Sequence, residues 1–196
     1  MPVRFSPVPM ADPVDRVMVT VTFLRMARPP DYAPRALPPE LSVAHAREPT
    51  VAFYRYLYNT VGGAYLWWLR RVAADADIAR LLANPSISIH VLYRAGAPAG
   101  FYELERRPGA EINLSYFGLM PHAVGQGLGT GFLHHAIGTA WAERPNAMTV
   151  NTCNADNPRA LPGYLAAGFT PVREVRELWS VPRRLGLSVP KQLKVS

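Results

Sequence analysis

The most constraining feature of this sequence is a run of alternating glycines that follows an apolar strand. Residues 111–119 have the composition of a strand, and a helix is predicted from Leu128 onward. Glycine occupies four alternate positions there, 125, 127, 129 and 131. Glycine lets the backbone adopt positive φ and approach a ligand closely, and a helix start presents unpaired N–H groups. The segment therefore predicts a site for a phosphate-bearing ligand.

The glycine spacing does not match two common phosphate loops. A G-x-G-x-x-G loop would need glycine at Thr130 or at Phe132, and a P-loop would need a lysine that is absent here. The run also lies in mid-chain after several predicted antiparallel strands, whereas those folds place it after a first parallel strand. A different phosphate-binding architecture is therefore expected.

Length and composition predict one folded, soluble domain. The chain has 196 residues, of which 49% are hydrophobic and 18% charged. No apolar run approaches the roughly 20 residues that span a bilayer. Residues 1–7 lack the apolar core of a signal peptide, so a cytoplasmic location is expected. The single cysteine, Cys153, excludes an internal disulfide framework.

The net charge of +7 comes almost entirely from arginine. A basic balance fits either nucleic acid or a polyanionic small cofactor. The arginines are scattered, with pairs at most, and no basic run is interleaved with aromatic residues. This distribution favours the small cofactor, and a basic nucleic-acid-associated protein stays as the weaker alternative.

The order of predicted elements divides the chain into four parts. Residues 1–47 hold a strand over 17–26 and a proline-rich loop, and residues 48–84 read as helical, with a break at Gly62-Gly63. On the first helix, Phe53, Tyr56, Leu57 and Val61 are expected to share one face. Residues 85–181 form the core, and residues 182–196 form a peripheral tail.

The core is predicted to be a mixed, mostly antiparallel sheet. Strands over 86–94, 99–106 and 111–119 should form an antiparallel meander. A helix over 128–143 then leads to a strand over 148–152, parallel to strand 111–119. Asn157 is predicted to cap a further helix that ends at Gly168, before a last strand over 172–181.

Two sequence blocks carry a resemblance to a known family. Gly127-Leu128-Gly129 matches the glycine part of a loop written Q/R-x-x-G-x-G/A, although Val124 stands at its first position. About thirty residues later, Asn157, Ala160, Tyr164 and Gly168-Phe169 match N-x-x-A-x-x-x-Y-x-x-x-G-F. In this order and spacing, the blocks resemble the GCN5-related N-acetyltransferase (GNAT) family over roughly residues 86–181.

The resemblance implies a fold, a reaction and a cofactor. The expected fold is an α/β (α+β) domain with a sheet of about six or seven strands and helices on both faces. The expected reaction is direct transfer of an acetyl group from acetyl-CoA to a primary amine of a small molecule or peptide, in a protein that forms a homodimer or acts alone. The cofactor lies in a cleft between two splayed parallel strands, and no metal takes part. The expected cofactor contacts are Phe117, Leu119, Val124, Gly125, Gln126, Gly127, Leu128, Gly129, Thr130, Gly131, Asn157, Ala160 and Tyr164.

The same resemblance assigns the chemistry to a few residues. Tyr164 stands where relatives place the acid that protonates the leaving thiolate, and the Leu119 N–H is the expected thioester donor. Glu111 is the favoured base, with Glu103, Glu105 and water as rivals. The aromatic-rich region 50–75 is expected on the amine side. A domain that binds CoA without catalysis is the alternative function.

Overall fold

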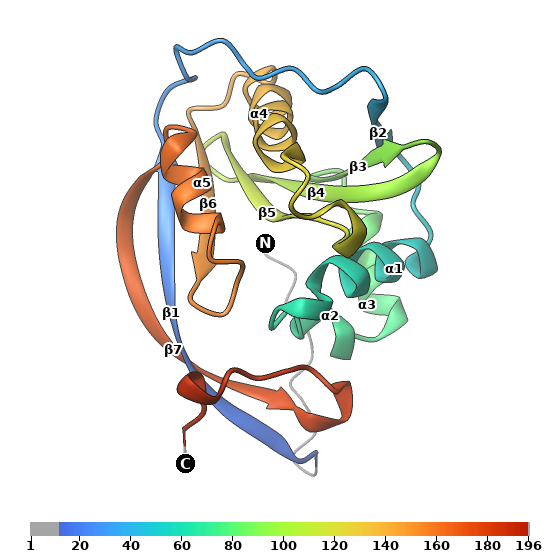
Figure 1. Cartoon of the computed structure of the whole chain (residues 1–196), viewed down its shortest axis with the longest axis vertical. Helices are drawn as coiled ribbons and strands as arrows, with labels where there is room; N and C mark the ends of the chain where they lie inside the picture. The colour runs from blue at the N-terminus through green and yellow to red at the C-terminus, as the bar shows by residue number, and fades with distance from the viewer. Residues whose placement is uncertain (1–11, 196) are drawn as a thin grey trace.

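The computed structural model describes residues 12–195, so the expectation about a signal peptide in residues 1–7 falls outside the described part. The chain folds around one seven-stranded sheet (Figure 1). The strands are β1 (Val14–Met26), β2 (Leu41–Ala46), β3 (Ile87–Arg94), β4 (Ala97–Arg107), β5 (Glu111–Leu119), β6 (Ala147–Cys153) and β7 (Thr170–Pro182). The α-helices are α1 (Val51–Val61), α2 (Leu69–Val72), α3 (Asp75–Leu82), α4 (Leu128–Trp141) and α5 (Ala160–Ala166). Single 3-10 turns stand at Gly62–Ala64, Pro121–Ala123, Arg183–Leu185 and Lys191–Leu193.

The sheet is mixed and mostly antiparallel, as the sequence predicts. Its strand order is β2-β3-β4-β5-β6-β1-β7. Strands β2 to β5 form an antiparallel meander, β5 and β6 are parallel, and β1 lies antiparallel between β6 and β7. Parallel neighbours need a crossover connection, and α4 provides the one between β5 and β6. The first strand of the chain is therefore an inner strand at the far end of the sheet, where β7 forms the edge.

Strands β5 and β6 separate halfway along their length. They pair only from Glu111 with Ala147 to Leu114 with Val150. At the next residue, Ser115, β5 carries a bulge, because Glu103 of β4 pairs with Tyr116 and Leu104 pairs with Leu114. The rest of β5 diverges from β6, which leaves an open crevice between two parallel strands.

Helices cover both faces of the sheet. Helices α4 and α5 pack on one face around Phe132, Tyr102 and Phe169, and α1 and α3 pack on the other around Tyr54, Leu57 and Phe101. A third apolar cluster fills the space beside the long β1–β7 pair. These layers follow from the alternation of the strands, which have apolar residues on both sides near the centre of the sheet.

The structure corrects several sequence-based expectations. Strand β2 lies inside the segment predicted as a proline-rich loop, because its six residues give too short a pattern to recognise. Helix α5 begins at Ala160 rather than after Asn157, whose Oδ1 instead accepts the N–H of Arg159 at 2.9 Å. On α1 the buried residues include Tyr54 and Tyr58, whereas Tyr56 is exposed. In the described part of the chain, no helix is both long enough and apolar enough to cross a membrane.

Candidate active site

The open crevice between β5 and β6 belongs to a cavity of about 830 Å³ that passes through the sheet. On one side it is lined by the glycine run and the start of α4, and on the other by residues 65–70. Its far end reaches Phe23 of β1 and Trp179 of β7. A cavity of this size is in the range of small-molecule sites. It connects the phosphate-suited loop with an aromatic compartment on the opposite face.

The glycine run forms an open cradle at the N-terminus of α4. Gly125 and Gly127 have φ of 82° and 74°, a region that L-residues with side chains rarely adopt. A Cβ atom on either residue would meet nothing within 4 Å, so the backbone faces open space. Gly127 is the N-cap of α4, and among residues 12–195 no side chain caps this helix. The first N–H groups of α4 and its positive dipole end are thus available for an anion.

The backbone of β5 faces the crevice at Phe117 and Leu119. The Met120 N–H donates to the Ala99 carbonyl at 2.9 Å, and bonded and non-bonded pairs alternate along an antiparallel ladder. The preceding pair, Leu119 with Gly100, is therefore a non-bonded pair. Its N–H and carbonyl point away from β4 and toward the crevice, where an extended ligand can pair with them. The same alternation applies to Phe117.

The start of α5 and the loop before it form the wall opposite β5. Tyr164 is 6% exposed and lines the cavity. Burial, and to a lesser extent the charge of Asp156, raises the pKa of the Tyr164 phenol, which therefore stays protonated at neutral pH. Pro162 lies in the first turn of α5, where its missing N–H would have had no helical partner. This explains how a proline fits directly before the tyrosine.

Two hydrogen bonds join this wall to the segment between α1 and α2. The Trp67 indole N–H donates to Asp156 at 3.2 Å, and the Asn157 side-chain amide donates to the Tyr65 hydroxyl at 2.8 Å. Asp156 also accepts from the Thr152 hydroxyl at 2.9 Å. Residues 65–68, which the sequence places in a helix, are instead extended or turned and cover the crevice. Trp67 packs directly on Gly62. A Cβ atom at position 62 would lie only 2.5 Å from the Cβ of Trp67, so a larger residue does not fit there.

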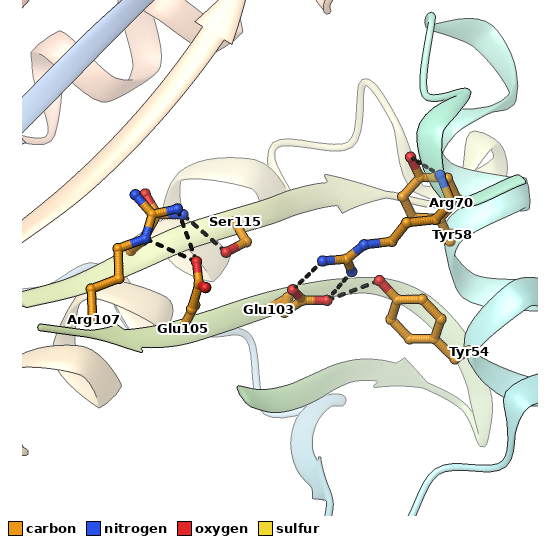
Figure 2. Close-up of polar contacts among 8 residues, drawn as sticks. Tyr54, Tyr58, Arg70, Glu103, Glu105, Arg107 and Ser115 are labelled. Atoms are coloured by element: carbon orange, nitrogen blue, oxygen red, sulfur yellow. Dashed lines mark hydrogen bonds and ion pairs between the residues drawn. The ribbon is translucent and has the colours of Figure 1, made fainter. Parts of the chain in front are cut away.

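Of the three candidate bases, Glu103 is fully buried and already paired. Figure 2 shows its carboxylate facing Arg70 of α2 and Tyr54 of α1. Arg70 Nη2 donates to Oε1 at 2.7 Å, Nη1 bonds the other oxygen, and the Tyr54 hydroxyl donates to that oxygen at 2.9 Å. The Glu103 side chain is 0% exposed and does not line the cavity. Glu103 therefore has a structural role.

The other two carboxylates lie at different depths along the sheet. Glu105 lines the cavity beside Arg107, to which it is ion-paired at 2.8 Å (Figure 2). Glu111 is ion-paired with Arg25 at 3.2 Å and does not line the cavity. Glu111 precedes the bulge at Ser115 by four residues, roughly 13 Å along the strand, on the side where β5 and β6 are still paired. Of these two carboxylates, Glu105 thus lies on the cavity wall and Glu111 does not.

Most of the predicted cofactor contacts line the cavity, and two do not. Gln126 bonds the Arg94 guanidinium through Oε1, and its Nε2 donates to the His122 carbonyl at 2.6 Å. Gly131 is buried, and a Cβ there would lie 3.4 Å from the Ala36 carbonyl. Both residues line a smaller neighbouring cavity. The predicted contacts on the main cavity are Phe117, Leu119, Val124, Gly125, Gly127, Leu128, Gly129, Thr130, Asn157, Ala160 and Tyr164.

Two arginines on the cavity escape recognition in the sequence. Arg35 lies in the proline-rich segment and lines the cavity. Its backbone N–H donates to Nδ1 of His134 in α4 at 2.8 Å. Arg159 lies just before α5. Both are exposed, and in the described part of the chain neither guanidinium has an acidic partner. Because they come from distant segments, only the fold reveals that they flank the same cavity.

Cys153 also lines the cavity, and its chemistry argues against a covalent role. Burial, followed by the charge of Asp156, raises the pKa of the thiol to about 12. The reactive form of cysteine is the thiolate, which is scarce at neutral pH under these conditions. Among the described residues, no cluster of histidine, cysteine and carboxylate side chains has the arrangement of a metal site.

The fold and the cavity define a GNAT-type domain, and comparison with known proteins agrees. A sequence profile of the Acetyltransferase (GNAT) family matches residues 50–169. This chain therefore belongs to the GNAT acetyltransferase family. A search among curated protein sequences finds no significant match.

Solved structures share the fold at low sequence identity. A tandem GNAT protein from the clavulanic acid biosynthesis pathway aligns with 90% of this chain at 16% identity and a TM-score of 0.60, over 57% of its own length. A GCN5-related N-acetyltransferase from Kribbella flavida aligns with 86% at 15% identity and a TM-score of 0.57, over 60% of its length. One from Sphaerobacter thermophilus aligns with 86% at 12% identity and a TM-score of 0.60, over 54%. The chain thus spans somewhat more than half the length of these structures.

Proposed function

We propose that this protein transfers an acetyl group from acetyl-CoA to a primary amine of a small molecule or peptide. The observation that carries the proposal is the continuity of one cavity from the glycine cradle, through the gap between β5 and β6, to the aromatic compartment on the other face. Acetyl-CoA supplies an activated acetyl thioester when it is bound. The cradle fits a diphosphate, since its backbone is open and the helix dipole favours negative charge.

Each wall of the cavity then has a defined task. The free N–H and carbonyl groups of Phe117 and Leu119 hold an extended arm in the gap, and the cations of Arg35 and Arg159 attract phosphates at its mouth. The Leu119 N–H, which points away from β4 into the gap, would be the donor that stabilises negative charge on the acyl oxygen. The Tyr164 phenol holds a proton that it can donate to a departing sulfur.

The amine enters from the compartment formed by residues 65–70. An amine must lose a proton before it attacks, and Glu105 is the candidate carboxylate that faces this space. Trp67 and Tyr116 line the same compartment and offer ring faces to a cationic amine. The sequence-based assignment of this task to Glu111 lacks such access, since Glu111 is absent from the cavity wall.

The test is release of free thiol from acetyl-CoA in the presence of a panel of primary amines and peptides. The proposal predicts release that depends on both the enzyme and one class of amine, with the acetylated amine detected by mass spectrometry. CoA binding without release for any amine would indicate a binding module instead. A protein that neither binds CoA nor releases thiol would overturn the proposal.

A further inference from the structure

The outer edge of the sheet carries an unusual arrangement of charge. Strand β7 is the last strand in the sheet order and pairs only with β1 among the described residues. It is 13 residues long, and most of its residues are exposed. Figure 1 shows β7 at the edge of the molecule beside β1. Pro171, which has no N–H to donate, is typical of an edge strand. A long edge of this kind is a template for pairing with another strand.

The charges on this edge are arranged symmetrically about Val175. Residues at equal distances on either side of Val175 carry opposite charges. Residues 172–178 read Val-Arg-Glu-Val-Arg-Glu-Leu. If two copies paired antiparallel about a two-fold axis at Val175, each residue before Val175 would lie opposite the residue at the same distance after it in the other copy. Arg173 then faces Glu177 of a second copy, and Glu174 faces Arg176. Every charged residue in this stretch would meet the opposite charge.

From this pattern we propose that two copies of the chain pair through β7 in antiparallel register about Val175, which joins their sheets into one. Antiparallel cross-strand neighbours share a face, so Glu174 and Arg176 would form two equivalent ion pairs there. The Arg176 guanidinium has no ion-pair partner in the described part of the chain, and Glu174 accepts only a hydrogen bond from Thr22 at 3.0 Å. Val172 is the extra residue of a β-bulge, because Phe23 pairs with Arg173 and Leu24 pairs with Pro171, so the proposed pairing covers residues 173–177.

The charges on this edge have an alternative explanation. Charged side chains on edge strands commonly prevent pairing with other sheets. Charges of one sign would repel a second copy in any register, whereas this order of signs attracts one in the register about Val175. Pairing at this edge would also affect the cavity, because Glu177 and Trp179 of β7 line its far end. A second strand would lie beside this end of the cavity in each copy. This inference does not depend on the proposed function.

The first test measures mass in solution against protein concentration by light scattering and sedimentation, from about 1 to about 200 µM. Pairing of edge strands gives a modest interface, so a concentration-dependent dimer is expected. Arg176→Glu alone and Glu174→Arg alone each turn two attractive pairs into repulsive ones. Each should lower the association constant about tenfold or more. The double variant Glu174→Arg with Arg176→Glu exchanges the charges and should dimerise like the parent.

A mixing experiment separates the pairing from any effect on folding. Arg176→Glu and Glu174→Arg should each be monomeric alone and should form a heterodimer when mixed, because all cross-strand pairs become attractive again. The control reversals are Arg47→Glu and Glu48→Arg, two exposed charges next to β2 at the opposite end of the sheet. They should leave the association unchanged. A monomeric parent over the whole concentration range, or single variants that dimerise like the parent, would overturn the proposal.

Discussion

The guanidinium of Arg70 and the carboxylate of Glu103 form a two-point ion pair (Figure 2). The two side chains are 8% and 0% exposed. The Arg70 guanidinium also lies 4.3 Å from the centre of the Tyr116 ring, which lines the cavity. The pair thus joins the short helix α2 to β4 and supports one wall of the site. The pair also holds the Glu103 carboxylate away from the cavity.

Removing one partner of this pair should destabilise the protein strongly. Arg70→Met leaves a buried carboxylate without its counter-charge, which should cost about 3 to 5 kcal/mol in the free energy of unfolding. Glu103→Gln removes the counter-charge of the Arg70 guanidinium, and the double variant should lose clearly less than the sum of the two. Urea unfolding followed by circular dichroism measures all four proteins. Strictly additive losses would show that the two groups do not interact energetically.

A comparison of two glutamates tests which carboxylate takes the proton from the amine. Glu105→Gln should lower kcat/KM about 10- to 100-fold, because the residue lines the compartment and its replacement cannot accept a proton. Glu111→Gln changes a residue outside the cavity and should alter turnover less than about threefold. Thiol release under identical conditions gives both values. The opposite ranking would restore Glu111 as the base and contradict the geometry.

The tyrosine of α5 should contribute to turnover more than to cofactor binding. Tyr164→Phe removes a phenol that burial keeps protonated, so kcat should fall about 10- to 100-fold. The affinity for CoA should change only a few-fold, because the ring and its packing on Phe169 remain. Tyr56→Phe, which alters an exposed tyrosine, is the matched control. A parallel loss of CoA affinity and turnover would show that Tyr164 binds rather than donates a proton.

A buried histidine on the α4 side should make the stability depend on pH. His90 stacks between His45 and Tyr102, with ring centroids 4.7 Å apart in both pairs. Burial, followed by the charges of His45, His135 and Arg106, lowers the pKa of His90 to about 4. Between pH 6.5 and 4 the unfolded state binds the proton more readily than the folded state, so stability falls as the pH falls.

The size of this effect can be isolated by substitution. Relative to its value at pH 7, the free energy of unfolding at pH 4.5 should fall about 2 kcal/mol less for His90→Phe than for the parent. Denaturant titrations at the two pH values provide the comparison, and His122→Gln, an exposed histidine, serves as the control. An equal fall in the parent and in His90→Phe would place the acid sensitivity elsewhere.

Local patterns predict the parts of the fold that depend on neighbouring residues. Alternating apolar residues indicate β3 to β6, and the glycine spacing together with the block around Tyr164 indicates the family. Gly168 ends α5 with φ of 95°, as a helix-terminating glycine should. The break of the first helical region at Gly62 is likewise confirmed. In each case the signal lies within a few residues of the feature.

Features that depend on distant partners are not visible in the sequence. The apolar pattern of β1 predicts a strand but does not specify its place between β6 and β7. The bulge at Ser115 depends on how β4 and β5 align, and it shifts the side chains that counting along the strand would assign to the cleft. The ion pair of Glu103 with Arg70 joins residues 33 positions apart. Gln126 similarly turns to Arg94, which only the fold brings near.

The central claim is that the glycine cradle and the gap between β5 and β6 bind CoA. Isothermal titration of the parent protein with CoA should give one site per chain. Gly127→Val should weaken that affinity about tenfold or more, because it adds a side chain to the open cradle at a φ of 74°. Thermal unfolding of both proteins without ligand controls for folding. Absence of binding heat for the parent at millimolar CoA would contradict the account.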